Sequence, residues 1–125
     1  MLPLFLHTPS GIPAGDLNLA LLDVGQGLSA VMRTTWHTLA YDTGPGFSGS
    51  SDTGDIVIIP WLQICVVKAP DLAIVSHADN DHAGALRSLR AVYADMPVLS
   101  GEPARISAGR NLSGWSILGM GWGAF

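Results

Sequence analysis

The chain has 125 residues and a formal net charge of −4, and 48% of its residues are apolar whereas only 13% are charged. That length fits one domain with a buried core, and the low charge argues against intrinsic disorder. The six Lys and Arg residues are scattered, so they form no basic surface that would grip nucleic acid. The single cysteine excludes an internal disulfide and a cysteine-based zinc finger.

The sequence predicts no membrane-spanning segment. Its longest apolar stretch, Ile56–Val67, is interrupted by Pro60 and Gln63 and is shorter than the roughly 20 residues that cross a bilayer. The N-terminus lacks the basic start and the long apolar run of a signal peptide, so we expect the chain as given to be cytoplasmic. Its apolar excess indicates a surface that is covered by a partner or by further chain.

Three short strands are predicted after an irregular N-terminal segment, residues 1–16. Leu17–Asp23 is an apolar run closed by glycines, which is typical of a strand that leads into a tight turn. Leu28–Arg33 and Thr38–Asp42 predict the second and third strands. Because these pieces are short and closely spaced, we expect adjacent antiparallel pairing.

The next two segments differ in how clearly they can be interpreted. Gly46–Gly54 consists mostly of small residues and is expected to form a loop. Asp55–Val67 is ambiguous, because its β-branched residues favour a strand while Pro60 opposes both a central strand and a helix interior. The sequence alone leaves the structure of this segment open.

The remaining chain predicts a buried strand, a helix and a further short strand. Asp71–Ser76 is the strand, Ala83–Tyr93 carries apolar residues at helical spacing, and Val98–Leu99 follows the proline that ends the helix. Residues 101–125 are rich in Gly and Trp and show neither the two-residue period of a strand nor the 3.6-residue period of a helix. They are interpreted either as a poorly ordered tail or as residues that pack against chain outside this sequence.

The segment SHADNDHAG carries the chemistry. Two imidazoles and two carboxylates fall within six residues, between the buried strand and the helix, namely His77, Asp79, Asp81 and His82. His and Asp together suit Zn²⁺, or Mn²⁺ where oxygen ligands dominate. The alternative is a polar loop in which Asp79 or Asp81 only caps the following helix.

This motif resembles the metal-binding motif of the metallo-β-lactamase fold, His-x-His-x-Asp-His, with Asp79 in the place of the second His. An Asp at this place is typical of one branch that the sequence resembles, the C-terminal domain of the ComEC-type DNA-internalisation competence proteins. Three more segments are similar to that branch: LDVGQG at Leu22–Gly27, YDTG at Tyr41–Gly44, and Asp52–Leu62, which forms a helix there. The resemblance covers about residues 17 to 100.

The resemblance implies an α/β fold, the αββα sandwich of the metallo-β-lactamases, with two divalent metal ions (Zn or Mn) at the sheet edge. By position, His77 and Asp79 match ligands of the first ion, and Asp81 and His82 match ligands of the second. Asp81 also matches the catalytic residue that orients or activates water. The signature loop and the following turn match supporting elements, with Asp23 positioning the site through hydrogen bonds. The supporting residues are Asp23, Gly25, Gln26, Gly27, Asp42 and Gly44.

The family draws further ligands, a His, an Asp and a last His, from a second half of the domain. This chain has no His after His82. We therefore expect residues 17–100 to be the N-terminal half of the sandwich, with residues 101–125 as a truncated or poorly ordered tail and a metal site short of ligands.

The functional hypothesis that follows is a fragment of a metal-dependent hydrolase, of phosphodiesterase or nuclease type, in DNA uptake during natural competence and transformation. DNA is the expected partner. The parent protein is expected to include a membrane channel portion and to associate with the inner membrane of a bacterium. Whether this chain is itself an enzyme stays open at this point. The alternatives are a non-catalytic truncated remnant and a binding module whose metal site is completed by a partner chain.

Overall fold

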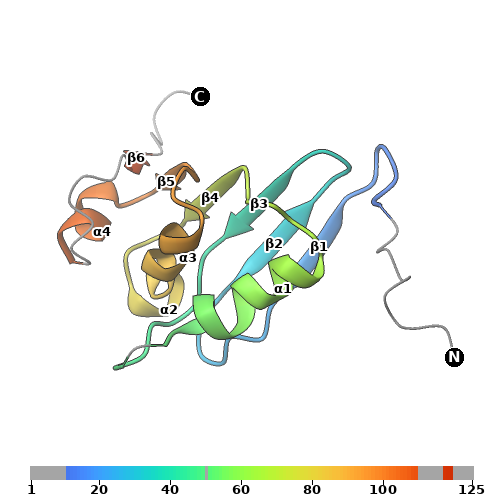
Figure 1. The fold of residues 1–125 in the computed structure, drawn as a ribbon. Coiled ribbons are helices and arrows are strands. Elements are labelled where there is room, and N and C mark those ends of the chain that lie inside the picture. The colour runs from blue at the N-terminus through green and yellow to red at the C-terminus, as the bar shows by residue number, and fades with distance from the viewer. Residues whose placement is uncertain (1–10, 50, 110–116, 120–125) are drawn as a thin grey trace, which may run out of the picture.

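The computed structural model describes residues 11–49, 51–109 and 117–119 (Figure 1). Six strands form one mixed sheet in the order β1-β2-β3-β4-β5-β6. The strands are β1 (Asn18–Leu21), β2 (Ala30–Arg33), β3 (Thr38–Tyr41), β4 (Leu72–Val75), β5 (Val98–Ser100) and β6 (Ile117–Gly119). The helices are the π-helical turn η2 (Gly54–Ile58), α1 (Ile59–Ile64), α2 (Asn80–Ala83), α3 (Leu86–Val92) and α4 (Pro103–Gly109).

The first three strands pair antiparallel, as the sequence predicts. β1 pairs with β2 and β2 with β3, with Ala30 opposite both Leu21 and Tyr41. The β2–β3 connection is a tight turn in which the Thr34 N–H donates to the carbonyl of His37 (2.9 Å). Such local connections suffice for antiparallel pairs, whereas parallel pairs need a longer crossover.

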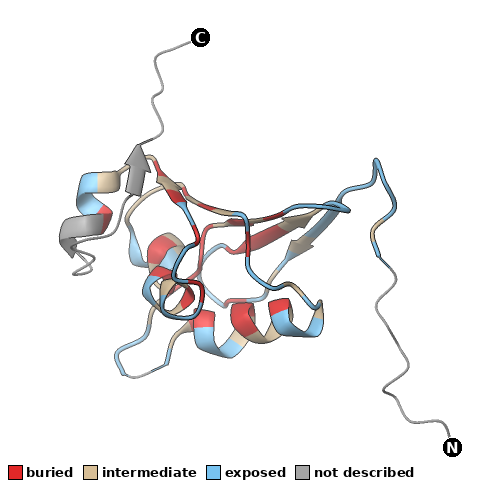
Figure 2. Cartoon of the chain, turned by 45° about the horizontal axis from the view of Figure 1, so that its top comes forward, coloured by how far each residue is buried: buried red, intermediate tan, exposed pale blue. Residues whose placement is uncertain are grey.

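The second half of the sheet is parallel, from β3 through β6. η2 and α1 connect β3 to β4, α2 and α3 connect β4 to β5, and α4 lies between β5 and β6. Figures 1 and 2 show α1 and α3 on the same side of the strands. Because β3 and β4 are parallel neighbours, their carboxyl ends lie at the same edge of the sheet. The polar segment that follows β4 is placed at this edge.

The ambiguous segment Asp55–Val67 is helical as far as Ile64, where α1 ends. Pro60 falls in the first turn of α1, where a residue without an N–H removes no intrahelical hydrogen bond. Ile58 and Leu62, four residues apart, are fully buried beneath the sheet. Burial of these side chains thus outweighs the strand propensity of the β-branched residues.

Helical structure after β4 begins earlier than predicted and comes in two pieces, α2 and α3. Leu86 and Leu89 of α3 are fully buried, in agreement with the predicted apolar face. In the stretch without sequence periodicity, the structure forms α4 and β6, and residues 110–116 and 120–125 lie outside the described residues. Residues 11–16 contain no helix or strand, and residues 1–10 are also not described. The proposed division at residues 17 and 100 stays a prediction.

The core lies on the helix-covered face of the sheet. Val31, Ala73, Val75 and Val98 point to this face and are buried against α1 and α3. The other face is also apolar, and we call Leu19, Leu21, Met32, Leu39 and Ile74 the open sheet face. Leu19 and Leu21 are 57% and 72% exposed, and the others are half-buried. Among the described residues, no helix is long and apolar enough to cross a membrane.

Candidate metal centre

The candidate site forms where β3 and β4 end side by side. Asp42 directly follows β3, and Ser76 and His77 directly follow β4. The Asp42 N–H donates to the carbonyl of Ile74 (2.8 Å), and the Thr43 N–H donates to the carbonyl of His82 (2.6 Å). The end of β3 is therefore bonded both to β4 and to the metal-motif loop that follows it.

Asp42 is the buried anchor of this arrangement, with a relative exposure of 1% and a left-handed backbone (φ 52°) that Asp tolerates better than most residues. Its Oδ1 accepts a hydrogen bond from the Ser76 N–H (2.7 Å), and its Oδ2 lies 2.6 Å from Nδ1 of His82. An ionised carboxylate only accepts hydrogen bonds, so Nδ1 of His82 carries the proton. The Nε2 lone pair of His82 is therefore free to bind a metal.

Ser76 links Asp42 to the second imidazole, that of His77, and so determines which of its ring nitrogens carries the proton. Its hydroxyl lies 2.8 Å from Asp42 Oδ2 and 2.9 Å from Nδ1 of His77. Because the hydroxyl has one proton and donates it to Asp42, it accepts from His77, which places that proton on Nδ1 as well. Both imidazoles thus have Nε2 as their available donor atom.

Three side chains converge at the resulting site. His77, Asp81 and His82 each offer one ligand atom, and these atoms lie within 4.8 Å of one another. His82 Nε2 is 3.4 Å from Asp81 Oδ2, and the two imidazole centroids are 3.9 Å apart. Two neutral imidazole nitrogens, each fixed by a hydrogen bond at Nδ1, and one carboxylate form a donor set that fits Zn²⁺ or Mn²⁺. The predicted ligand assignment itself stays a prediction.

Asp79 is placed differently from these three residues. Its Oδ2 is 3.6 Å from Nε2 of His77, but its Oδ1 pairs with the Arg105 guanidinium at 3.2 Å, and it is not in the group of three. Asp79 precedes α2 and makes no side-chain capping hydrogen bond there. The alternative in which Asp79 only caps the helix therefore does not describe this carboxylate.

The signature loop at Leu22–Gly27 holds the metal motif through its backbone. The Leu28 N–H, just after the loop, donates to the carbonyl of Asp81 (3.1 Å), and the Gly44 N–H donates to the carbonyl of Leu28 (2.8 Å). A Cβ at Gly27 would lie 2.5 Å from the Asp81 carbonyl oxygen. Glycine is thus required there, because two backbones touch.

A second close approach involves Gly84, at the end of α2. A Cβ on Gly84 would collide with the backbones of Pro45, Gly46 and Asn80. The Asn80 side chain pairs with Gly46 in both directions, donating to its carbonyl (2.9 Å) and accepting from its N–H (3.3 Å). The loop after β3 is therefore fastened to the metal motif.

Asp23 acts within its own loop. Its Oδ1 accepts a hydrogen bond from the Gly25 N–H (3.2 Å), and Gly25 has a left-handed φ of 73°. The predicted role of Asp23 in positioning the site is therefore indirect, through the shape of the loop. Next to Asp81 lies a cavity of about 580 Å³ lined by Val24, Gly25, Gln26, Pro45, Gly46, Phe47, Asn80 and Asp81. Gln26 is exposed on this cavity.

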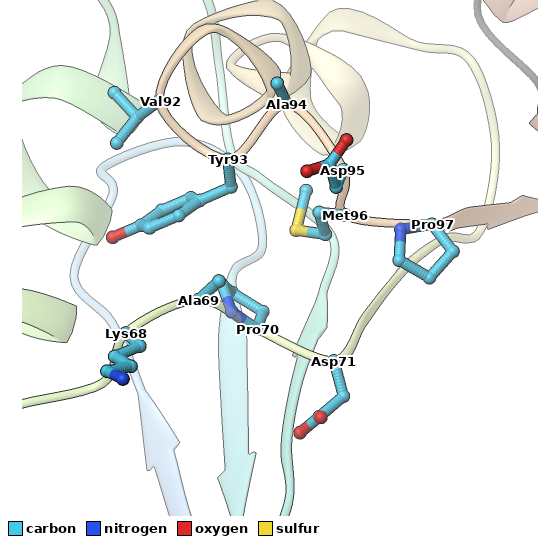
Figure 3. A pocket seen from close by; sticks show the side chains of 10 residues that line it. All are labelled: Lys68, Ala69, Pro70, Asp71, Val92, Tyr93, Ala94, Asp95, Met96 and Pro97. Carbon is cyan, nitrogen blue, oxygen red and sulfur yellow. The ribbon is translucent and has the colours of Figure 1, made fainter.

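A second cavity, of about 390 Å³, lies at the opposite end of the sheet, between residues 68–71 and 92–97 (Figure 3). The Tyr93 ring and the Met96 side chain face Pro70 across it. Burial raises the pKa of the Tyr93 hydroxyl. This cavity has no group of metal-ligating side chains among the described residues.

Several residues around the site have roles that the sequence does not reveal. The motif assigns no role to Ser76, and the resemblance gives Asp42 only a supporting one, although together they fix both imidazoles. Glu102 and Arg105 reach the metal motif from α4 and its approach. No local pattern signals these two, because 24 and 26 residues separate them from Ala78 and Asp79.

Comparison with known proteins finds relatives that include a competence protein and a recombination protein. No protein-family model matches the chain. It is 34% identical to "Recombination protein 2" of Haemophilus influenzae over 101 residues, which is 81% of this chain and 12% of that protein. It is 31% identical to "Competence protein ComA" of Neisseria gonorrhoeae over 96 residues, 73% of this chain and 13% of that protein. An uncharacterized Escherichia coli protein, YcaI, is 39% identical over 78 residues, 62% of this chain and 10% of that protein.

The solved structures support the fold. The metallo-β-lactamase FIM-1 from Pseudomonas aeruginosa, in its mono-zinc form, matches with a TM-score of 0.56 at 14% identity, covering 86% of this chain and 48% of that one. The chain thus spans about an eighth of the curated relatives and about half of this enzyme. The predicted α/β fold of metallo-β-lactamase type is confirmed. The relatives and the fold together show that the chain belongs to the metallo-β-lactamase-fold domain of the ComEC-type competence protein family.

Proposed function

We propose that this chain supplies the metal-binding motif of a metal-dependent phosphodiesterase or nuclease domain that acts on DNA during uptake. One observation carries the proposal: Asp42 and Ser76 hydrogen-bond to the Nδ1 atoms of the two imidazoles, and His77, His82 and Asp81 each offer one ligand atom within 4.8 Å of the others. A buried carboxylate behind a histidine is the usual way in which proteins orient a metal ligand.

The association with DNA uptake is supported by the relatives, one of which is named a competence protein and another a recombination protein. DNA as the substrate, a membrane channel portion in the longer protein and attachment to the inner membrane of a bacterium are parts of this proposal. The chain itself has a net negative charge. Attraction of a phosphate to the site would therefore depend on the bound cation.

A divalent metal, when bound, would polarise a phosphoryl oxygen and lower the pKa of a coordinated water. The chain's own residues would hold that metal through Nε2 of His77 and His82 and through the Asp81 carboxylate. Asp81 is 53% exposed and lines the 580 Å³ cavity, so substrate and water can reach it. We assign to Asp81 the additional role of orienting the attacking water and accepting its proton.

The test measures metal binding and hydrolysis with the same preparations. The 125-residue chain is titrated with Zn²⁺ and with Mn²⁺ and then assayed on a chromogenic phosphodiester and on single-stranded DNA. We expect His77→Ala to abolish both binding and hydrolysis. His37→Ala is the matched control, because His37 is exposed at the β2–β3 turn, away from the site. Hydrolysis that is indifferent to His77→Ala would refute the proposal.

A second candidate is a non-catalytic module whose metal site is completed by residues of a partner. It is favoured by the number of converging ligand residues in the described part of the chain, which is three, whereas structural metal sites are usually closed by four. The open sheet face offers an apolar surface for such a partner. Stoichiometric metal binding by wild type without hydrolysis of either substrate would favour this candidate over the enzyme.

A further inference from the structure

The cavity beside the metal motif contains an exposed aromatic ring that the proposed metal site does not explain. Phe47 lines this cavity of about 580 Å³ together with Asp81, and it is 54% exposed. It is the only aromatic or large aliphatic residue between positions 44 and 54, which otherwise hold Gly, Pro, Ser, Asp and Thr. A single exposed apolar residue is ordinary on a protein surface, so the significance of Phe47 depends on its position and its support.

The backbone that carries Phe47 is fixed to the metal motif and to the interior. Gly46, which precedes it, exchanges two hydrogen bonds with the Asn80 side chain (2.9 and 3.3 Å). The carbonyl of Pro45 accepts hydrogen bonds from the hydroxyl (2.9 Å) and the N–H (3.3 Å) of Thr53, which is buried. Phe47 therefore follows a firmly held stretch of backbone, and little ordering would be needed for its ring to contact a ligand.

The cavity combines apolar and polar lining. Its apolar side chains are Val24, Pro45 and Phe47, and its polar side chains are Gln26, Asn80 and Asp81. Its volume lies within the range of about 300–1,000 Å³ that is typical of sites for small organic ligands. A nucleotide has the same two parts, because its base presents an apolar face and its phosphate is polar and charged.

The charge of the lining indicates how such a nucleotide would be held. No Lys or Arg is among the residues that line this cavity. A cation bound beside Asp81 would supply the positive charge for the phosphate, and the base would have to bind by stacking. An aromatic side chain can stack on any of the bases, because each base has a π-face, so this contact needs no particular sequence.

We propose that Phe47 is a substrate-positioning residue whose ring stacks on an unpaired base of a DNA strand, while a phosphate of that strand lies at the metal beside Asp81. In a duplex, neighbouring base pairs cover both faces of each interior base, so the ring can accept only a base from a single strand or a frayed end. This inference rests on the proposed function for the identity of the substrate as DNA. It adds a preference for single strands that depends on one side chain.

The test measures binding, so that it does not depend on turnover. Two short fluorescent single strands are compared by anisotropy in the presence of Mn²⁺, both with phosphorothioate linkages that resist hydrolysis, one with ordinary bases and one with abasic residues. We expect wild type to prefer the ordinary strand by about 5- to 150-fold, which is the range for one base stacked on an aromatic side chain. Phe47→Leu should lose most of this preference, because Leu has no flat face, and Phe47→Trp should retain it.

The matched control is Trp36→Leu. Trp36 is 81% exposed at the β2–β3 turn, away from the site, so this variant should keep the preference of wild type. Phe47→Leu should unfold in urea close to wild type, because Phe47 is largely exposed. A duplex of the same sequence should bind Phe47→Leu and wild type alike, because its interior bases have no free face.

The remaining outcomes separate this inference from the proposed function. A Phe47→Leu variant that keeps the full preference overturns the inference, and so does an equal loss of affinity for both strands, which would indicate damage to the loop. Failure of wild type to prefer the ordinary strand overturns it as well. In each of these cases, metal-dependent hydrolysis of DNA by wild type leaves the proposed function standing. A preference that depends on Phe47 without any hydrolysis supports the inference and contradicts the proposed enzyme.

Discussion

Replacement of Asp42 by Asn tests the hydrogen-bond chain that orients both imidazoles. The substitution preserves shape but converts one acceptor oxygen into an amide donor. If the remaining oxygen still accepts from the Ser76 N–H, the amide faces Nδ1 of His82, which must then become the acceptor. The proton of His82 moves to Nε2, and the lone pair that a metal needs is lost.

The magnitude follows from two separate effects. Loss of an outer hydrogen bond to a ligating His costs about 10- to 100-fold in metal affinity, or roughly 1.4 to 2.8 kcal/mol. Replacement of the buried, charge-assisted bond by a neutral one should lower the free energy of unfolding by about 1–1.5 kcal/mol even without metal. Calorimetric titration with Zn²⁺ measures the first quantity, and urea unfolding without metal measures the second.

The matched control is Asp95→Asn, because Asp95 is exposed at the opposite end of the sheet. Ser76→Ala is a milder variant, since it cuts the link to His77 and leaves the Asp42–His82 contact in place. It should lose less affinity than Asp42→Asn. A folded Asp42→Asn variant that binds Zn²⁺ within about twofold of wild type would refute the claim that Asp42 selects the His82 tautomer.

Three further predictions concern the packing around the site and its pH dependence. Gly84→Ala should lower the free energy of unfolding by about 1–3 kcal/mol or more, because the new methyl group meets neighbouring backbone, whereas Gly11→Ala, in open space, should leave urea unfolding nearly unchanged. Leu62→Ala should cost about 2–5 kcal/mol, and Leu21→Ala on the open sheet face much less; equal losses would contradict the location of the core. Hydrogen bonds from the Ala78 N–H and from Arg105 lower the pKa of Glu102, so its stabilising contribution is complete above about pH 4.5 and is lost as the pH falls through the lowered value. Glu102→Gln should therefore melt below wild type at neutral pH and approach it in acid, and a difference that persists unchanged in acid would speak against the assigned contacts.

The strands and the metal motif could be predicted because their signals are local. Leu17–Asp23 and Asp71–Ser76 are short apolar runs bounded by turn residues, and both form strands at those places. The pair of imidazoles with Asp81 is readable for the same reason, since six consecutive residues carry it. These side chains are close in space because they are close in the sequence, within the short segment that follows β4.

The segments that escaped prediction depend on contacts between distant residues. The β-branched residues of Asp55–Val67 gave conflicting local signals, and the outcome depended on burial of Leu62 under strands that lie far away in the chain. The pairing of Arg105 with Asp79 spans 26 residues and depends on the pairing of β5 with β4, which brings the start of α4 to the metal motif. No pattern within one sequence indicates which carboxylate an exposed arginine contacts.

The backbone contacts around the metal motif also bear on how a metal would be bound. The carbonyls of Asp81 and His82 already accept hydrogen bonds from Leu28 and Thr43, and Gly27 and Gly84 let the loops touch. A cation entering this site would therefore order few residues, so little conformational entropy would be lost on binding. In a zinc finger, by contrast, metal binding and folding are one event. Amide hydrogen exchange of Leu28 and Thr43, which donate these bonds, should accordingly be slow before metal is added and should change little afterwards.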